Sequence, residues 1–541
     1  MLHSNLVLIL GLLFGITLLV MLGQKLKIAF PVFLVVAGLI IGFIPGIPHI
    51  AIDPNLIFLI FLPPLLYEAA WFTSWKNFWE YKGAIFLMAI GLVIITSIAV
   101  AYFSVYFIPG FTLALGFVLG GIISPPDAVA ASAILKNVKI KKETLALLEG
   151  ESLVNDASSL IVFKFALAAV VTGNFVFHNA AIGFVLVAFG GIAIGLGIAL
   201  VFYAIHRWLP TTDNIDTVLT FITPYFMYIA AEELQVSGVM AVVSGGLLLS
   251  SQSHVIFTSD SRVKTFSTWS AVTFILNGVV FILIGLALPD IVAGMEQRYS
   301  LPEAIGFGAA LSLLTIVVRF AWMETTRYVT LLVNKQTRIR YQGVTWRDRL
   351  IVVLAGMRGV VSLAAALSIP LLISNTAVFP FRNFILFITF VVIFFTLVVQ
   401  GLMLPWVVKV LKITGNKFKL SHDEQLSQIK IHLTEVTVKK LENDYSLQCS
   451  NNQLLGNYKA ELISTLHSKK KNLEALKIGT TDKKGMTAYN TIMLDIIKAQ
   501  RKEMHELKKN MELDDEIIRQ EEWQLDLEEM KINSFLSNLN D

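Results

Sequence analysis

Long apolar stretches alternate with short polar loops over the first three quarters of the chain. A helix that crosses a bilayer needs about 20 predominantly apolar residues. Thirteen stretches approach or exceed that length, of which 236–251 is the shortest. They are 5–22, 28–44, 52–71, 83–107, 111–134, 143–172, 178–206, 214–232, 236–251, 263–288, 301–333, 345–373 and 381–411. The pattern therefore predicts an all-α polytopic membrane protein with about 13 transmembrane helices.

The pattern changes near Gly415, after which Lys, Glu, Asp, Asn and Gln dominate. Leu and Ile recur there at helical spacing, which is typical of amphipathic helices outside the membrane. We therefore expect a transmembrane domain at 1–412 and a helical cytoplasmic domain at 413–541, the latter with a regulatory role. The acidic run from Glu512 to Glu529 contains Trp523 and is interpreted as a solvated helix face.

Composition supports a membrane protein and excludes several other classes. The 541 residues are 55% hydrophobic and only 15% charged, which is outside the range of soluble domains. A net charge of +4 is too small to argue for nucleic acid. The single cysteine, Cys449, excludes an intrachain disulfide and a cysteine-based metal site. Because the chain has no Walker-type phosphate loop, zinc-peptidase pattern or serine-hydrolase elbow, we expect no enzyme and no cofactor.

Lys and Arg are concentrated in alternate loops, which predicts the orientation of the chain. The opposite loops carry only Arg298 and Arg382. The basic loops are therefore assigned to the cytoplasm, with the N-terminus outside and the C-terminus inside. Their basic residues are Lys25, Lys27, Lys76, Lys82, Lys136, Lys139, Lys141, Lys142, Arg207, Arg262, Lys264, Lys335, Arg338, Arg340, Arg347, Arg349, Lys409 and Lys412.

The segment 150–156, GESLVND, places two carboxylates inside a predicted span. Charge at membrane depth is expensive unless it is paired or lines a wet cavity, so it usually marks an ion or proton path. Ser152 and Asp156 share one helix face, and Glu151 and Asn155 share the adjacent one. Carboxylate, hydroxyl and amide oxygens suit a hard cation.

The segment 120–128, GGIISPPDA, predicts a break in the fifth span. Pro125 and Pro126 each lack an N–H and clash with the preceding helical turn. A break exposes free carbonyls and half-helix ends, from which transporters build ion sites. Asp127 lies at this break and is a second candidate ion ligand, the alternative being a proline kink with a structurally paired aspartate.

The segment 354–360, LAGMRGV, predicts a second break, in the twelfth span, where glycines flank Arg358. A buried guanidinium needs a carboxylate, and the candidates are Glu151, Asp127 and Asp156. We favour a structural ion pair between Arg358 and Glu151, because a permanent positive charge would repel a cation bound nearby. Breaks at equivalent positions of two halves are typical of inverted-repeat transporters.

Four other charged positions remain open. Lys164 is interpreted as a structural residue that snorkels outward. Arg319 and Glu324 are interpreted as a local pair or as the ends of a shorter span. Glu68 lies near the end of its span, where it could line an entry funnel or simply face the interface.

Together these segments resemble the cation/proton antiporter-1 family, the NhaP/NHE-type sodium–proton exchangers, in their bacterial form. The resemblance implies an NhaA-like fold of inverted repeats with two discontinuous crossing helices. It also implies a homodimer in the plasma (inner) membrane, in which a core of spans four to six and eleven to thirteen moves against a scaffold. The matching segments are 61–66, 124–130, 150–157, Glu232 with 237–239, and 356–359.

The resemblance also implies roles for individual residues. Asp156 would bind either Na⁺ or a proton, and Ser152, Asp127 and a backbone carbonyl near Pro126 would complete the ion site. Asn155 would be a polar neighbour. Many relatives carry Thr at the position of Pro126, so a side-chain ligand is not expected there.

The mechanism expected from these residues is an electroneutral exchange of one Na⁺ or Li⁺ for one proton, since a cation and a proton compete for Asp156. Relatives with two adjacent aspartates are generally electrogenic, whereas this chain has Asn155. K⁺/H⁺ exchange is an alternative, because ligand type alone does not fix cavity size. A cation channel or a non-transporting sensor is the alternative from a different class.

Overall fold

The structure is a computed structural model that describes residues 2–26, 28–44, 58–127, 131, 142–173, 177–294, 299–333, 345–373, 378–411, 422–478, 483–507, 521, 524–533 and 536. The chain divides into two compact units, Met1–Asn416 and Lys417–Asp541. Every regular element in the described ranges is a helix, accompanied by two isolated β-bridges. The prediction of an all-α protein is therefore confirmed.

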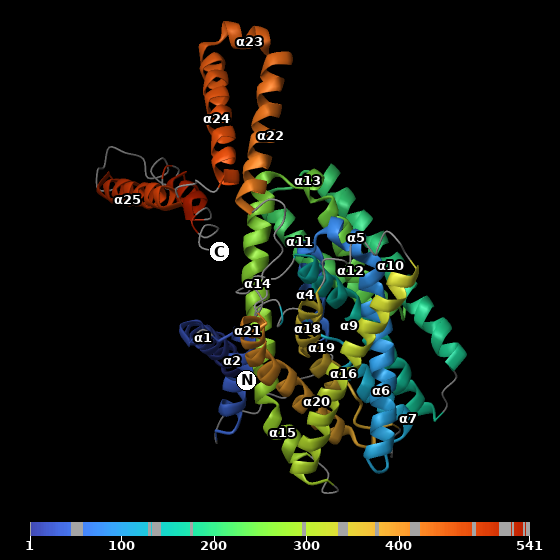
Figure 1. Ribbon diagram of the computed structural model, residues 1–541. Coiled ribbons are helices and arrows are strands. Elements are labelled where there is room, and N and C mark those ends of the chain that lie inside the picture. The colour runs from blue at the N-terminus through green and yellow to red at the C-terminus, as the bar shows by residue number, and fades with distance from the viewer. Residues whose placement is uncertain are drawn as a thin grey trace. The chain divides into compact units, whose positions relative to one another are not determined.

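The first unit contains the apolar helices, and each predicted span coincides with one or more of them (Figure 1). Six described helices are long and apolar enough to cross a membrane, and others are shorter, so the count of thirteen stays a prediction. The elements are α1 (Leu2–Leu26), α2 (Phe30–Gly42), α4 (Leu62–Phe72), α5 (Trp75–Phe86), η1 (Leu87–Gly91), α6 (Leu92–Phe107), α7 (Leu113–Ile123), α9 (Lys142–Thr172), α10 (Phe177–Trp208), α11 (Asp213–Glu233), α12 (Gly238–Ser251), α13 (Ser253–Ile256), α14 (Ser259–Leu286), α15 (Leu288–Ala293), α16 (Leu301–Val333), α18 (Trp346–Leu354), α19 (Val360–Leu367), α20 (Arg382–Phe394), η2 (Phe395–Val399) and α21 (Gln400–Val410).

Side-chain caps fix where several of these helices begin. Thr112, Ser237 and Thr258 each accept a hydrogen bond from the backbone three residues later, which satisfies one of the free N–H groups of the first turn. Thr345 and Asp348 form a reciprocal capping box at the start of α18. The polar residues at these boundaries therefore set the ends of α7, α12, α14 and α18.

Glycines allow α7 to pack closely between α6 and α9. A Cβ added at Gly120 would lie 2.7 Å from the carbonyl oxygen of Ser97 in α6. A Cβ added at Gly121 would lie 2.9 Å from the backbone nitrogen of Phe163 in α9. Because only glycine permits such an approach, α7 is held against the helix that carries the GESLVND segment.

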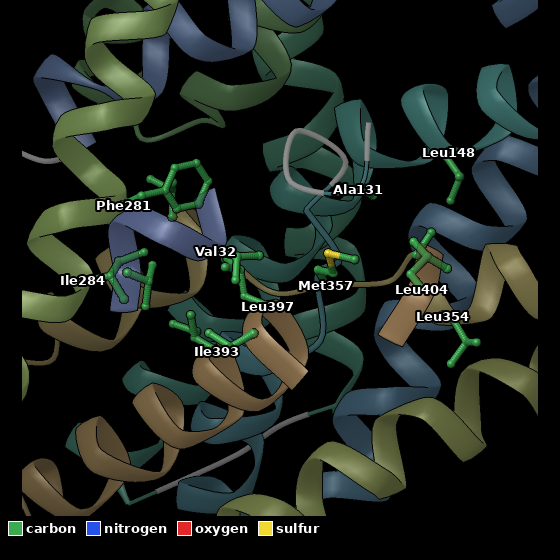
Figure 2. Packing of buried hydrophobic residues seen from close by; sticks show 14 of the residues in the cluster. Val32, Ala131, Leu148, Phe281, Ile284, Leu354, Met357, Ile393, Leu397 and Leu404 are labelled. Carbon is green, nitrogen blue, oxygen red and sulfur yellow. The ribbon is translucent and has the colours of Figure 1, made fainter. Parts of the chain in front are cut away.

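The helices of the first unit pack in two groups. α5, α6, α7 and α9 pack with one another, as do α16, α18, α19, α20 and η2, and α7 joins the two sets through α19 and α20. In the other group, α11 packs against α10, α12 and α14, and α12 packs against α4. The two groups meet along α9, which also packs against α12, α10 and α4. Buried apolar side chains fill the interior, and Figure 2 shows Met357 among Val32 and Leu397 from separate helices.

The second unit is a helical hairpin followed by a further helix. Its elements are α22 (His422–Asn443), α23 (Ser446–Asn451), α24 (Gln453–Ile478) and α25 (Lys483–Leu507). The ion pairs Glu442–Lys459 and Glu435–Lys470 join α22 to α24 in antiparallel order. The Lys470 ammonium, 2.7 Å away, holds the pKa of the Glu435 carboxyl below its usual value.

Some predicted features lie outside the described residues. These are 128–130 at the end of the double-proline motif, Lys27, Lys136, Lys139, Lys141, Lys335, Arg338, Arg340, Lys412, Arg298, the segment 413–421, and much of the acidic run together with Trp523.

Candidate functional site

The first break is at the double proline, as predicted from the sequence. Helix α7 ends at Ile123, and Ser124 closes its last turn by donating its N–H to Gly120 O at 3.0 Å. Pro125 and Pro126 follow in non-helical conformation. Because neither proline has an N–H to donate, the helical hydrogen-bond ladder cannot continue through this segment.

The second break is at the glycines around Arg358, also as predicted. Helix α18 ends at Leu354 and α19 begins at Val360, with Gly359 in a non-helical conformation (φ −145°, ψ −133°) as the N-cap. The five residues between the two helices contain no helical turn of their own. Span 345–373 is therefore two half-helices rather than one.

The two breaks meet each other. The Asp127 N–H donates to Met357 O at 2.6 Å, in an isolated antiparallel bridge between the segments. The carboxylate of Asp127 lies directly against Gly359, where an added Cβ would be only 1.9 Å from Oδ2. Asp127 is therefore at the start of α19, where the helix dipole favours a negative charge.

Helix α9 passes beside the first break and contributes the predicted polar residues. Asn155 is fully buried and donates from Nδ2 to Pro126 O at 2.9 Å. Asp156 is 8% exposed and lies close enough to Asp127 for their charges to interact. Ser152 lies one turn before Asp156 and is partly buried. The structure thus brings α9 to the crossing of the broken helices.

The expected ion pair between Glu151 and Arg358 is wrong, because Glu151 pairs with Arg319 of α16. The Arg319 guanidinium donates from both terminal nitrogens to the Glu151 carboxylate, at 2.6 and 2.8 Å. Both side chains are 1% exposed. A two-pronged contact of this kind satisfies both charges away from water, so Glu151 is neutralised without Arg358.

Arg358 instead donates to carbonyl oxygens that the breaks leave free. Its Nε donates to Ile123 O at 2.9 Å, at the last residue of α7, and a terminal nitrogen donates to Gly356 O. A positive charge at the C-terminal end of a helix is also stabilised by the negative end of the helix dipole. Arg358 is therefore a clamp: it holds the two broken segments together by donating to a backbone carbonyl oxygen of each, and its partners are not the expected carboxylate.

The π-helical segment η2 and the residue after it support the second break. Thr396 accepts from the Arg358 N–H at 3.1 Å, and Gln400 donates from Nε2 to Leu354 O. Single-turn π-helices often occur at functional sites. Thr396 and Gln400 therefore complete the backbone hydrogen bonds that the glycine break leaves open.

One other expectation is corrected by the contacts, and Lys164 has a partner that was not predicted. Glu324 accepts from Arg349 of α18 at 2.6 Å and from Arg327 at 3.2 Å, so Arg319 and Glu324 are not a local pair. Lys164 pairs with Glu232 of α11 at 2.8 Å.

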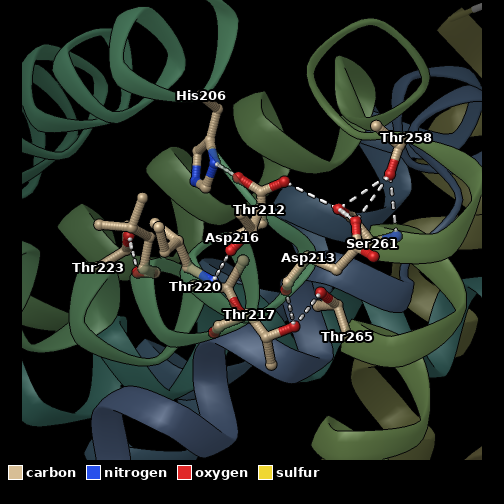
Figure 3. Close-up of polar contacts among 12 residues, drawn as sticks. His206, Thr212, Asp213, Asp216, Thr217, Thr220, Thr223, Thr258, Ser261 and Thr265 are labelled. Atoms are coloured by element: carbon tan, nitrogen blue, oxygen red, sulfur yellow. Dashed lines mark hydrogen bonds and ion pairs between the residues drawn. The ribbon is translucent and has the colours of Figure 1, made fainter. Parts of the chain in front are cut away.

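A second polar cluster lies apart from the breaks, where α10, α11 and α14 meet (Figure 3). The His206 ring is 2.8 Å from the Asp216 carboxylate, which also accepts from Ser261 at 2.9 Å. Ser261 is also 2.7 Å from Asp213. This network ties three helix ends of the second packing group together.

Sequence reasoning missed Arg319, Met357, Thr396 and Gln400 as residues that support the site. Arg319 carried a usable signal, because a second arginine within an apolar span also requires a buried acid. Met357 acts through its backbone, and Thr396 and Gln400 are polar residues in an apolar span with no local pattern.

Comparisons with known proteins find relatives over most of the chain. The family described as "Sodium/hydrogen exchanger, transmembrane" matches residues 9–410. A "Sodium, potassium, lithium and rubidium/H(+) antiporter" of Bacillus subtilis is 35% identical over 383 residues, covering 69% of this chain and 57% of that protein. An uncharacterized Na⁺/H⁺ exchanger of Escherichia coli is 29% identical over 495 residues, covering 88% of this chain and 89% of that protein.

A solved structure supports the fold. The sodium proton antiporter MjNhaP1 from Methanocaldococcus jannaschii superposes with a TM-score of 0.59 at 18% identity, over 75% of this chain and 98% of that one. This likeness shows the fold, and the matching family is one of transporters rather than enzymes. The match over residues 9–410 covers most of the chain, which therefore belongs to the sodium/hydrogen exchanger family of membrane antiporters.

Proposed function

We propose that this protein exchanges one Na⁺ or Li⁺ for one proton across the plasma (inner) membrane, with Asp156 binding the two ions alternately. The observation that carries the proposal is the burial of Asp156 beside Asp127 where two broken helices cross. Two carboxylates near each other in a region of low polarity favour binding of a cation or a proton.

The ion ligands in this proposal are oxygens from two elements. Asp156 and Ser152 come from α9, and Asp127 and the Pro126 carbonyl come from the first break. The Pro126 carbonyl already accepts from Asn155, but a carbonyl oxygen has a second lone pair. Asn155 therefore orients the carbonyl, and a hard monovalent cation fits the oxygen set.

Electroneutral exchange follows if only one group changes its charge during the cycle. Glu151 is paired with Arg319 through two hydrogen bonds, and residue 155 is an amide. Asp127 lies at the N-terminal end of α19, where its negative charge is stabilised. Asp156 then remains as the group that exchanges a proton for a cation.

K⁺ is the second candidate cation, because the B. subtilis relative is named as an antiporter of potassium as well as sodium. A homodimer, an outside N-terminus, a cytoplasmic C-terminus and a regulatory role for Lys417–Asp541 belong to the same proposal. A channel or a sensor would predict no coupling between cation and proton movement, which makes coupling the decisive measurement.

The test is to reconstitute the purified protein into sealed vesicles that contain a pH dye, and to add Na⁺, Li⁺ or K⁺ outside. Wild-type protein should produce a cation-driven pH change, and the ranking of rates would identify the ion. Asp156→Asn should abolish the response, because an amide cannot exchange a proton. Asp260→Asn is a matched control at an exposed position in the first turn of α14.

Two outcomes would contradict the proposal. A folded wild-type protein without response to any cation over a wide pH range would favour the channel or sensor. An imposed membrane voltage that drives exchange would contradict electroneutrality while leaving antiport intact.

A further inference from the structure

Lys164 and Glu232 form an ion pair outside the ion site described above. The Lys164 ammonium donates to both carboxylate oxygens of Glu232, at 3.1 and 2.8 Å. The side chains are 56% and 36% exposed. The pair is therefore accessible from the protein surface and is not part of the packed interior.

The two residues belong to different packing groups. Lys164 follows Asp156 by two turns of α9, or about 12 Å along the helix. Glu232 lies near the end of α11, which packs against α10, α12 and α14. Helix α9 also packs against α10, α12 and α4 of the other group. The pair therefore adds a polar contact to the boundary along which the two groups already meet.

Glu232 has an anchor that does not depend on Lys164. Its Oε1 also accepts from the Gly238 N–H at 3.4 Å, at the first residue of α12. A carboxylate at a helix N-terminus is stabilised by the helix dipole. Glu232 would therefore keep a favourable environment if Lys164 moved away, and the long Lys164 side chain is free to follow α9.

A second ion pair on α9 differs from this one in its exposure and in the helices that it joins. Glu151 and Arg319 are each 1% exposed and join α9 to α16. Separating a buried pair leaves an uncompensated charge and is strongly unfavourable. Separating a pair at the protein surface leaves neither charge buried in the packed interior, so it costs less. Helix α9 thus carries one permanent contact and one separable contact.

We propose that the Lys164–Glu232 pair is a separable contact between the two packing groups that positions α9 and sets the balance between the two access states. The inference rests on the proposed exchange, since alternating access requires one group of helices to move against the other around the ion site. A contact made in only one state shifts the equilibrium toward that state.

The test compares the half-saturating Na⁺ concentration for exchange at the two membrane faces, in vesicles of opposite orientation. Lys164→Gln and Glu232→Gln should each raise this concentration at one face and lower it at the other, because apparent affinity depends on the population of the competent state. We expect the ratio of the two values to shift about two- to fivefold. Lys164→Arg retains the charge and should keep the wild-type ratio.

A matched control is Glu324→Gln, which removes an ion pair between α16 and α18, helices of the same packing set. It should leave the ratio unchanged. An unchanged ratio in both Lys164→Gln and Glu232→Gln, or equal shifts at both faces, would overturn the inference.

Cross-linking provides a second readout. The chain has one cysteine, so Lys164→Cys with Glu232→Cys can be studied in a Cys449→Ser background. A short, reducible cross-linker should stop exchange, and reduction should restore it. Full exchange by completely cross-linked protein would overturn the inference, as would failure to cross-link at all. If wild type itself shows no exchange, the proposed function fails instead.

Discussion

The two helix breaks cross each other, yet they are built from different residues and bring opposite charges. The first break, at 124–127, is made by two prolines and contains Asp127. The second, at 355–359, is made by glycines and contains Arg358. Similar interruptions of two helices therefore supply one negative and one positive side chain to the crossing.

The two prolines of the first break lack donors, so their segment presents carbonyl oxygens. Pro125 and Pro126 have no N–H, and the carbonyls around them obtain donors from elsewhere in the chain. Asn155 donates to Pro126 O, and Arg358 donates to Ile123 O. Free carbonyl lone pairs beside Asp127 suit a cation, which is why the ion ligands are assigned to this break.

The glycine break provides space and keeps its N–H groups. Asp127 can approach only because Gly359 has no side chain. Arg319 also passes close to Gly356, where an added Cβ would lie 2.9 Å from its Nε, and this Nε donates to Val352 O at 3.1 Å. The comparison teaches that one break presents a carboxylate and carbonyl oxygens, whereas the other leaves room for Asp127 and for the Arg319 side chain.

The largest expected effect comes from filling the space at the crossing. In Gly359→Ala, the new Cβ would lie 1.9 Å from Asp127 Oδ2, and the carboxylate would have to move. We expect cation-driven exchange in vesicles to be lost. Gly306→Ala is the matched control, since nothing lies within 4 Å of its added Cβ. Normal exchange in Gly359→Ala would show that the two breaks do not need their close contact.

Removal of the clamp should have the next largest effect. Arg358→Met would leave Ile123 O and Gly356 O without their donor. Unsatisfied buried groups cost roughly 1–3 kcal/mol each, so we expect a loss of about 4 kcal/mol of stability, together with most of the exchange. The measurement is thermal unfolding in detergent alongside vesicle transport. Arg358→Lys, which keeps one donor, should lose less, and equal stability of all three proteins would rule out the clamp.

Removal of one donor from the proline break should have a smaller effect. Asn155→Ala would leave Pro126 O without a protein donor, and we expect a loss of about 2 kcal/mol and a several-fold slower exchange. Exchange should stay electroneutral, because no ionisable group is changed. Ser158→Ala is a suitable control on the same helix, since its hydroxyl bonds only to Val154 O within α9. A voltage-driven response in Asn155→Ala would contradict the assigned role.

The positions of both breaks could be predicted from the sequence because their causes are local. Adjacent prolines cannot remain helical in any surroundings, and glycines around a charged residue weaken a span. The polar face of α9 could be predicted for the same reason, from helical spacing alone. Local rules do not say which helix passes beside which, and the fit of Asp127 against Gly359 depends on that arrangement.

The partner of Glu151 could not be deduced by local rules. Arg358 and Arg319 were both available, and the choice depends on how α16 packs against α9, 168 residues apart in sequence. Arg358 also had possible partners other than carboxylates, namely backbone carbonyl oxygens. A helix break creates free carbonyls, and these accept from a guanidinium as well as an acid does.

The smallest expected effect tests whether η2 contributes to the glycine break beyond packing. Thr396→Val keeps the shape of the side chain but removes the hydroxyl that accepts from the Arg358 N–H at 3.1 Å. The hydroxyl also donates to Val392 O at 2.8 Å. The loss of these two neutral hydrogen bonds should lower stability by about 1 kcal/mol, and exchange should slow only slightly. Thr396→Ser keeps the hydroxyl and should behave as wild type. If Thr396→Val slowed exchange as much as Arg358→Met, the backbone of this break, rather than the arginine side chain, would be what holds the crossing in place.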